Sequence, residues 1–83
     1  MMQLARTPRQ IGNSVRRARK KLNLSQSQLG ARVSLRQETI SLIETGNAAT
    51  RIDTLLSVLA ALDLELQIAP RSKHAPSDIE DLL

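Results

Sequence analysis

Two helix-capping signals near the N-terminus constrain this chain to short helices more than any other feature of its sequence. The first is Thr7-Pro8-Arg9-Gln10, in which Thr7 caps a helix, Pro8 fits its first position and Gln10 completes a capping box. The second is the capping box Ser25-Gln26-Ser27-Gln28. Because each box marks a helix start, the chain has room for only one short helix between them.

The apolar residues that follow recur at helical spacing. The spacing predicts three helices, which begin at Thr7, at Ser25 and at Arg36, and each of them has one apolar face. The second helix runs to about Val33 and the third to Thr45, with Gly46 as its stop. The residues predicted to face the core are Ile11, Val15, Ala18 and Leu22 in the first helix, Leu29 and Val33 in the second, and Ile40 and Ile43 in the third.

A fourth helix is predicted after Thr50, which is placed to cap it, with Asp53 in its first turn. From Leu64 the apolar period changes from helical to two, and Pro70 ends the pattern, which predicts a strand. The apolar stripe of the helix is Ile52, Leu55, Leu56, Leu59 and Leu62, and the inward residues of the strand are Leu64, Leu66 and Ile68.

A lone strand leaves backbone groups that need partners. The same strand of a second subunit supplies them, so Leu64, Leu66 and Ile68 are the predicted dimerisation residues. A chain of 83 residues also buries too little surface to be very stable alone, which favours an oligomer.

Composition excludes several classes of function. The chain has no Cys and one His, so disulfides, thiolate zinc sites and an imidazole metal cage are excluded, and we expect neither an enzyme nor a cofactor. It has no Phe, Trp or Tyr, which excludes base stacking on aromatic side chains. No apolar run reaches the roughly 18 residues of a membrane span, and no secretory signal is evident, so a cytoplasmic location without membrane contact is expected.

The charges are divided unevenly along the chain. Residues 1–37 carry nine Lys and Arg and no Asp or Glu, whereas residues 38–83 carry three basic and eight acidic residues, a net charge of −5. One half of the molecule should therefore attract a polyanion. The basic residues from Arg16 to Lys21 are interpreted as a solvated helix face rather than as a set of direct phosphate contacts.

The segment Leu24-Ser25-Gln26-Ser27-Gln28-Leu29, followed by Thr39-Ile40-Ser41-Leu42-Ile43-Glu44-Thr45-Gly46 and a Leu-rich helix, resembles the Cro/C1-type (XRE) helix-turn-helix family over residues 8–66. The resemblance implies an all-α, lambda-repressor-like helix-turn-helix bundle. Ser34 departs from it, because the family has glycine at this turn, and a left-handed backbone there must tolerate a side chain.

The entry to the first helix and the strand after the Leu-rich helix are most similar to the HipB-type antitoxins. This resemblance implies a homodimer that represses its own operon and binds a HipA-type serine/threonine kinase toxin. The alternative is a stand-alone phage-type or metabolic repressor with no toxin. The absence of aromatic residues departs from members that end in a bulky aromatic residue.

The start of the third helix carries the predicted readers of a palindromic double-stranded operator. Gln37 is suited to pair with adenine, and Arg36 with guanine or with a phosphate. The alternative is that Gln37 or Arg36 is a solvent-exposed surface residue without a role in DNA binding. The resemblance places Gln26 and Thr45 at positions that contact phosphates. It places Thr39 and Ser41 on or beside the face that meets the DNA. Glu44 is interpreted as structural.

These patterns divide the chain into three parts. Residues 1–6 form an N-terminal arm, residues 7–69 the DNA-binding and dimerisation domain, and residues 70–83 a flexible polar tail. No metal site or effector pocket is evident.

Overall fold

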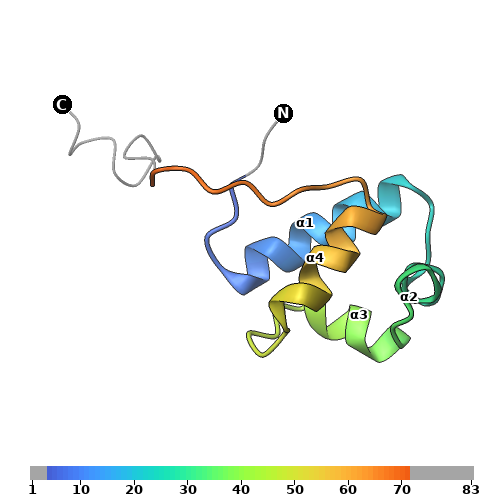
Figure 1. Cartoon of the computed structure of the whole chain (residues 1–83). Helices are drawn as coiled ribbons and strands as arrows, with labels where there is room; N and C mark the ends of the chain where they lie inside the picture. The colour runs from blue at the N-terminus through green and yellow to red at the C-terminus, as the bar shows by residue number, and fades with distance from the viewer. Residues whose placement is uncertain (1–3, 72–83) are drawn as a thin grey trace.

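A computed structural model describes residues 4–71 of the chain. These residues form four helices, α1 (Pro8–Lys21), α2 (Gln26–Val33), α3 (Gln37–Glu44) and α4 (Ile52–Ala61). Helix α3 packs on both α1 and α2, and α2 also contacts α4 (Figure 1). The prediction of an all-α bundle is confirmed for this part of the chain. None of these helices is long and apolar enough to cross a membrane.

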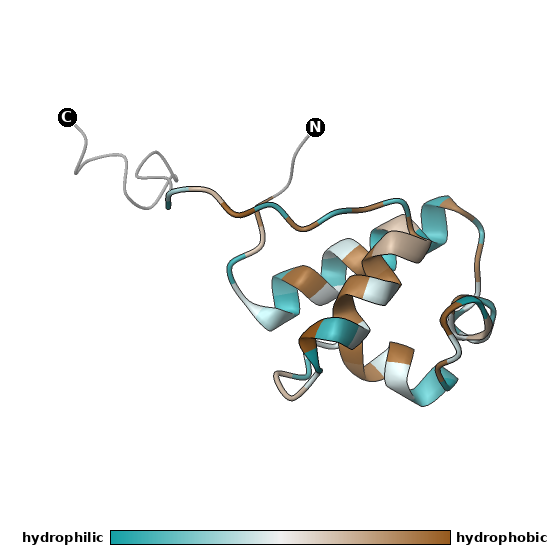
Figure 2. Cartoon of the chain, in the orientation of Figure 1, coloured by the Kyte–Doolittle hydropathy of each residue, from teal (hydrophilic) through white to brown (hydrophobic). Residues whose placement is uncertain are grey.

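The core is built from aliphatic side chains alone, one or more from each helix. Figure 2 shows the hydrophobic stretches of the helices turned toward one another. Fully burying one such side chain contributes about 1.5–3 kcal/mol. The buried apolar residues are Val15, Leu29, Ile40, Ile43, Val58, Leu59 and Leu62.

Helix α4 turns Leu55, Leu59 and Leu62 of the predicted stripe toward the core but not its other two residues. Ile52 is 73% exposed and Leu56 is 44% exposed, whereas Val58, absent from the predicted stripe, is fully buried. The inward positions of α4 are therefore Leu55, Val58, Leu59 and Leu62, the spacing of a single helical face.

The helix starts mostly follow the predicted capping. Ser25 and Gln28 form the complete capping box of α2. At α1 the Thr7 side chain accepts from the Gln10 backbone N–H, while the Gln10 amide oxygen accepts from the N–H of Arg6. The prediction that Thr50 caps α4 is wrong.

The cap residue of α4 is Arg51, one position later than predicted. The hydroxyl of Thr50 donates instead to the Asn47 carbonyl at 3.0 Å. This bond closes the turn before the helix, so the side chain is not free to reach the first turn of α4.

All four helices of the described residues end in the same way, with one residue in the left-handed conformation and a backbone bond back into the last turn. Gly46 ends α3 as predicted, and Ser34 adopts φ 58° and ψ 40° after α2, which confirms the left-handed turn with a side chain. Asn23 and Asp63 end α1 and α4. Short polar side chains tolerate this conformation better than apolar ones do.

Ser34→Gly is expected to stabilise the fold by about 0.5–1 kcal/mol, because glycine removes the cost of the left-handed conformation. Ser34→Val is expected to destabilise it, since a β-branched residue fits φ 58° poorly. Urea denaturation followed by circular dichroism measures both. Ser27→Gly, on the exposed face of α2, is the matched control and should lose stability. A loss of stability in Ser34→Gly would contradict this account of the turn.

The predicted strand does not appear as a strand in the single chain. Residues 64–71 are extended without regular pairing and run back over the bundle toward the N-terminal segment (Figure 1). Within the described residues Leu66 is 51% and Ile68 is 94% exposed. A single extended segment lacks the partner that a strand needs, so the pairing of two subunits remains a prediction. Residues 1–3 of the predicted arm and 72–83 of the predicted tail lie outside the described residues.

Candidate nucleic-acid interface

Close backbone contacts at two glycines hold α1 against α3 and α2 against the turn that leads into α3. A Cβ atom on Gly30 would lie 2.5 Å from the carbonyl oxygen of Leu35, in the turn between α2 and α3. A Cβ atom on Gly12 of α1 would lie 2.4 Å from the carbonyl oxygen of Ile43 in α3. Both distances are too short for any side chain, so these glycines allow α1 and α2 to approach α3 and fix its position.

A buried ion pair joins the far end of α3 to α1. The Arg19 guanidinium donates to the Glu44 carboxylate through Nε at 2.6 Å and through Nη2 at 3.0 Å. Its third nitrogen, Nη1, donates to the Leu24 carbonyl at 2.8 Å. Arg19 therefore also holds the turn between α1 and α2. Arg19 and Glu44 are only 8% and 5% exposed. The hydrogen bond to Glu44 raises the pKa of Arg19 against the opposing effect of burial.

The sequence prediction was wrong for Arg19 and right for Glu44. Arg19 lies one turn after Val15 on the inward side of α1, not on the solvated basic face. Its partner Glu44 is 25 residues away in the sequence, so no local pattern indicated the pair. The structural role expected of Glu44 is confirmed.

Gln26 connects this ion pair to the start of α3. Its amide Nε2 donates to Glu44 Oε1 at 3.2 Å, and its Oε1 accepts from Gln37 Nε2 at 3.1 Å. Gln26 is the first residue of α2 and Gln37 the first residue of α3. Two of the predicted DNA-binding residues are therefore in direct contact. We name the hydrogen-bonded path Arg19–Glu44–Gln26–Gln37 the amide relay.

The other predicted DNA-binding residues are distributed along α3. Arg36 is exposed at the N-terminal cap of the helix, beside Gln37. Thr39 and Ser41 are half-buried within it. Thr45 lies at the opposite end, where its hydroxyl donates to the carbonyl oxygens of Ser41 and Leu42, both at 3.1 Å. Arg36 and Gln37 thus form a polar end of α3, separated from Thr45 by about two helical turns.

Exposed basic side chains lie on α1, on α2 and in the turn before α3. Glu38, in the first turn of α3, is the exposed acid beside them. The positive field predicted from the sequence remains a prediction, which the exposure of these side chains supports. The exposed basic residues of this region are Arg16, Arg17, Lys20, Lys21, Arg32 and Arg36.

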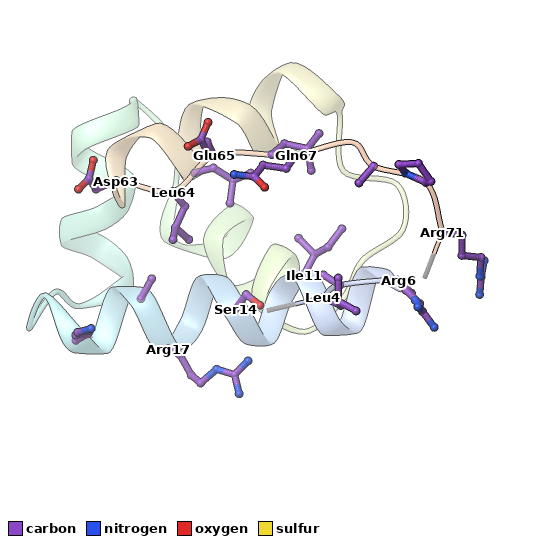
Figure 3. Close-up of a pocket in the computed structure, with 17 residues that line it drawn as sticks. Leu4, Arg6, Ile11, Ser14, Arg17, Asp63, Leu64, Glu65, Gln67 and Arg71 are labelled. Atoms are coloured by element: carbon purple, nitrogen blue, oxygen red, sulfur yellow. The ribbon is translucent and has the colours of Figure 1, made fainter. Parts of the chain in front are cut away.

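A groove separates α1 from the extended segment that follows α4 (Figure 3). Leu64 and Ile11 point into it from the two sides, and Leu4 and Leu66 also line it. Of the predicted dimerisation residues, Leu64 and Leu66 thus border one groove, whereas Ile68 is exposed beside it. The groove lies on the side of α1 away from the amide relay, which connects to α2 and α3.

The chain matches the family model described as Helix-turn-helix over residues 15–68. It is 41% identical over 61 residues to the uncharacterized HTH-type transcriptional regulator y4dL of Sinorhizobium fredii, a match that covers 74% of this chain and 31% of that protein. It is 26% identical over 74 residues to Antitoxin HipB of Escherichia coli K12, covering 89% of this chain and 84% of that protein.

Two solved structures show the same fold. A chain of a HipA–HipB–O2–O3 complex superposes with a TM-score of 0.78 at 25% identity, covering 86% of this chain and all of that one. A HipB–O4 20mer complex gives the same TM-score, identity and coverage.

Proposed function

The chain belongs to the Helix-turn-helix family of DNA-binding transcriptional regulators, and from this premise we propose that it is a dimeric, sequence-specific repressor. The observation that carries the proposal is the polar end of α3, where Arg36 is exposed and Gln37 is held by Gln26 of α2. A side chain that is already ordered loses little entropy when it binds a base.

In this proposal the N-terminal end of α3 enters the major groove of double-stranded DNA. Gln37 pairs with an adenine, and Arg36 pairs with a guanine or holds a phosphate. Gln26 and Thr45 contact phosphates and orient the protein, with Thr39 and Ser41 beside the DNA. Residues 7–69 carry both DNA binding and dimerisation, flanked by the arm 1–6 and the tail 70–83.

We further propose that the protein is the antitoxin of a HipBA-type operon, located in the cytoplasm. The support is the similarity to Antitoxin HipB over most of both chains and to a chain of a HipA–HipB–O2–O3 complex. The partner is then a HipA-type serine/threonine kinase toxin, and the antitoxin represses its own operon.

A stand-alone repressor is the second candidate. The higher identity to y4dL favours it, because that regulator is 41% identical where HipB is 26% identical. The chain spans only 31% of the length of y4dL.

Two measurements test these proposals. The full chain is used to select duplexes from a randomised DNA library, and we expect a palindrome whose half-sites lie about one helical turn apart. No preferred duplex at any salt concentration would contradict the repressor proposal. Co-purification with a kinase-like product of a neighbouring gene tests the antitoxin proposal, and its absence alongside operator binding would leave the stand-alone repressor.

Leu66→Pro is expected to convert the dimer to a monomer. Proline removes one backbone donor and one apolar side chain from the proposed intersubunit strand. Sedimentation equilibrium measures the mass, and Leu66→Val, which suits a strand, should keep the dimer. If the proline variant has the mass of a dimer, the subunits pair through another surface.

A further inference from the structure

The groove between α1 and the segment after α4 is lined by apolar side chains that stay partly exposed. Leu4 is 60%, Leu64 is 36% and Leu66 is 51% exposed. Ile11 and Leu64 point into the groove from its two sides (Figure 3). A partner with apolar side chains would cover this surface and remove it from water, which stabilises the contact.

The charged residues of the groove favour an acidic partner. Four basic and two acidic side chains line it, a net charge of +2. The acids, Asp63 and Glu65, both follow α4, so the charged residues that α1 contributes to the groove are all basic. Charge complementarity therefore selects a partner with acidic residues beside apolar ones. The basic residues that line the groove are Arg6, Arg17, Lys21 and Arg71.

The sequence beyond the described residues contains a segment of this kind, residues 78–83, which we name the acidic segment. It reads Asp-Ile-Glu-Asp-Leu-Leu and carries three acids and three large apolar residues. Ile79, Leu82 and Leu83 have the spacing of one face of a helix. This pattern is typical of segments that place an apolar helix face in a groove.

The chain between the groove and the acidic segment is long enough for the segment to return. Arg71, the last described residue, lines the groove. Along α1 the groove runs from Ile11 to Lys21, about 15 Å at a rise of about 1.5 Å per residue. Residues 72–77 span up to about 20 Å when extended. The whole groove therefore lies within reach of the acidic segment.

We propose that the acidic segment binds in the groove of its own chain and competes there with a second copy. A short tether gives the segment an effective concentration on the order of millimolar at the groove. A second copy lacks this advantage, and its groove carries the same positive charge. Leu64 and Leu66 are the side chains for which the two compete, and the competition rests on the proposed dimer.

A nitroxide beside the acidic segment measures the contact in the full chain. The sequence has no Cys, so Ser77→Cys provides a single site for the label. We expect the amide NMR signals of Ile11, Ala18 and Leu64 to lose most of their intensity when the nitroxide is oxidised, relative to its reduced form. Ile79→Ser with Leu82→Ser removes the apolar contacts of the segment and should restore the intensity.

Two lysines of α1 provide a matched pair on the groove side. Lys21→Glu reverses a charge that lines the groove and should restore much of the intensity. Lys20→Glu makes the same change at the neighbouring exposed residue, which is not among the residues that line the groove, and should keep the loss.

Sedimentation equilibrium of unlabelled chains measures the competition. Ile79→Ser with Leu82→Ser should lower the dissociation constant of the dimer, because the groove is then open to a second copy. Ala75→Ser, outside the acidic segment, should keep the wild-type value. An unchanged dissociation constant in the double variant would overturn the competition.

Full intensity of the groove signals in the labelled chain would overturn the inference, and so would equal effects of Lys20→Glu and Lys21→Glu. A loss that persists when the nitroxide and the isotope label are on different chains would show binding to a second copy, and it would overturn the inference as well. The proposed function stands in all these cases. A chain that is monomeric in every variant would contradict the proposed dimer, while the nitroxide still decides whether the acidic segment is bound.

Discussion

Glu44→Ala is expected to destabilise the fold by about 3–5 kcal/mol, because it leaves the Arg19 guanidinium buried without its carboxylate. Small domains have total stabilities near the lower end of about 5–15 kcal/mol. The variant should therefore be largely unfolded at physiological temperature. Thermal and urea denaturation followed by circular dichroism measure the loss.

A double variant distinguishes the effect of an unpaired buried charge from the effect of lost packing. Arg19→Met with Glu44→Leu replaces both charges by apolar groups of similar volume, and buried ion pairs replaced in this way often lose no stability. We expect the double variant to recover most of what Glu44→Ala loses. Equal loss in the two variants would mean that packing, rather than the unpaired charge, is the cause.

The exposed ion pair between Arg51 and Asp53 serves as the control. Its N–O distance of 3.1 Å is that of a good ion pair, but both side chains are largely exposed. Hydrogen bonds from Arg51 and from the Thr54 N–H lower the pKa of Asp53. Because solvent screens this pair, Arg51→Ala should leave the unfolding midpoint close to that of the wild type.

Arg36→Ala combined with Gln37→Ala is expected to remove about 2–6 kcal/mol of operator affinity, since each base contact contributes about 1–3 kcal/mol. Both side chains are exposed at the start of α3, so the fold should remain intact. Titration of the selected palindrome at one fixed salt concentration measures the loss. A double variant that binds the palindrome like the wild type would place base reading elsewhere.

The same double variant tests whether the two proposed activities use different surfaces. The proposed DNA-binding residues lie on α2 and α3 and at their ends, whereas the acids Asp53, Asp63 and Glu65 lie at the start of α4 and after its end. We expect the variant to co-purify with the proposed kinase toxin as the wild type does. Loss of both activities would mean that DNA and toxin share one surface.

Arg32 is an exposed charged residue on α2, and Arg32→Ala should weaken binding to all DNA sequences about equally.

Much of the helical arrangement could be predicted from local patterns. The capping residues Thr7 and Ser25 and the stop at Gly46 act on neighbouring backbone groups, within a few residues of themselves. The left-handed Ser34 could be predicted as well, because the resemblance identified the turn that requires it. Thr50 shows where this approach failed, because its hydroxyl had a competing acceptor in the preceding turn.

The sequence by itself therefore determined the number of helices, most of their boundaries and the basic half of the molecule, since these depend on interactions between near neighbours. Only the tertiary structure decided which face of α4 is buried, that Arg19 enters the interior, and that Gln26 joins Glu44 to Gln37. The physical reason is that a buried charge and an oriented amide each need a partner, and here the partners come from helices far apart in the sequence.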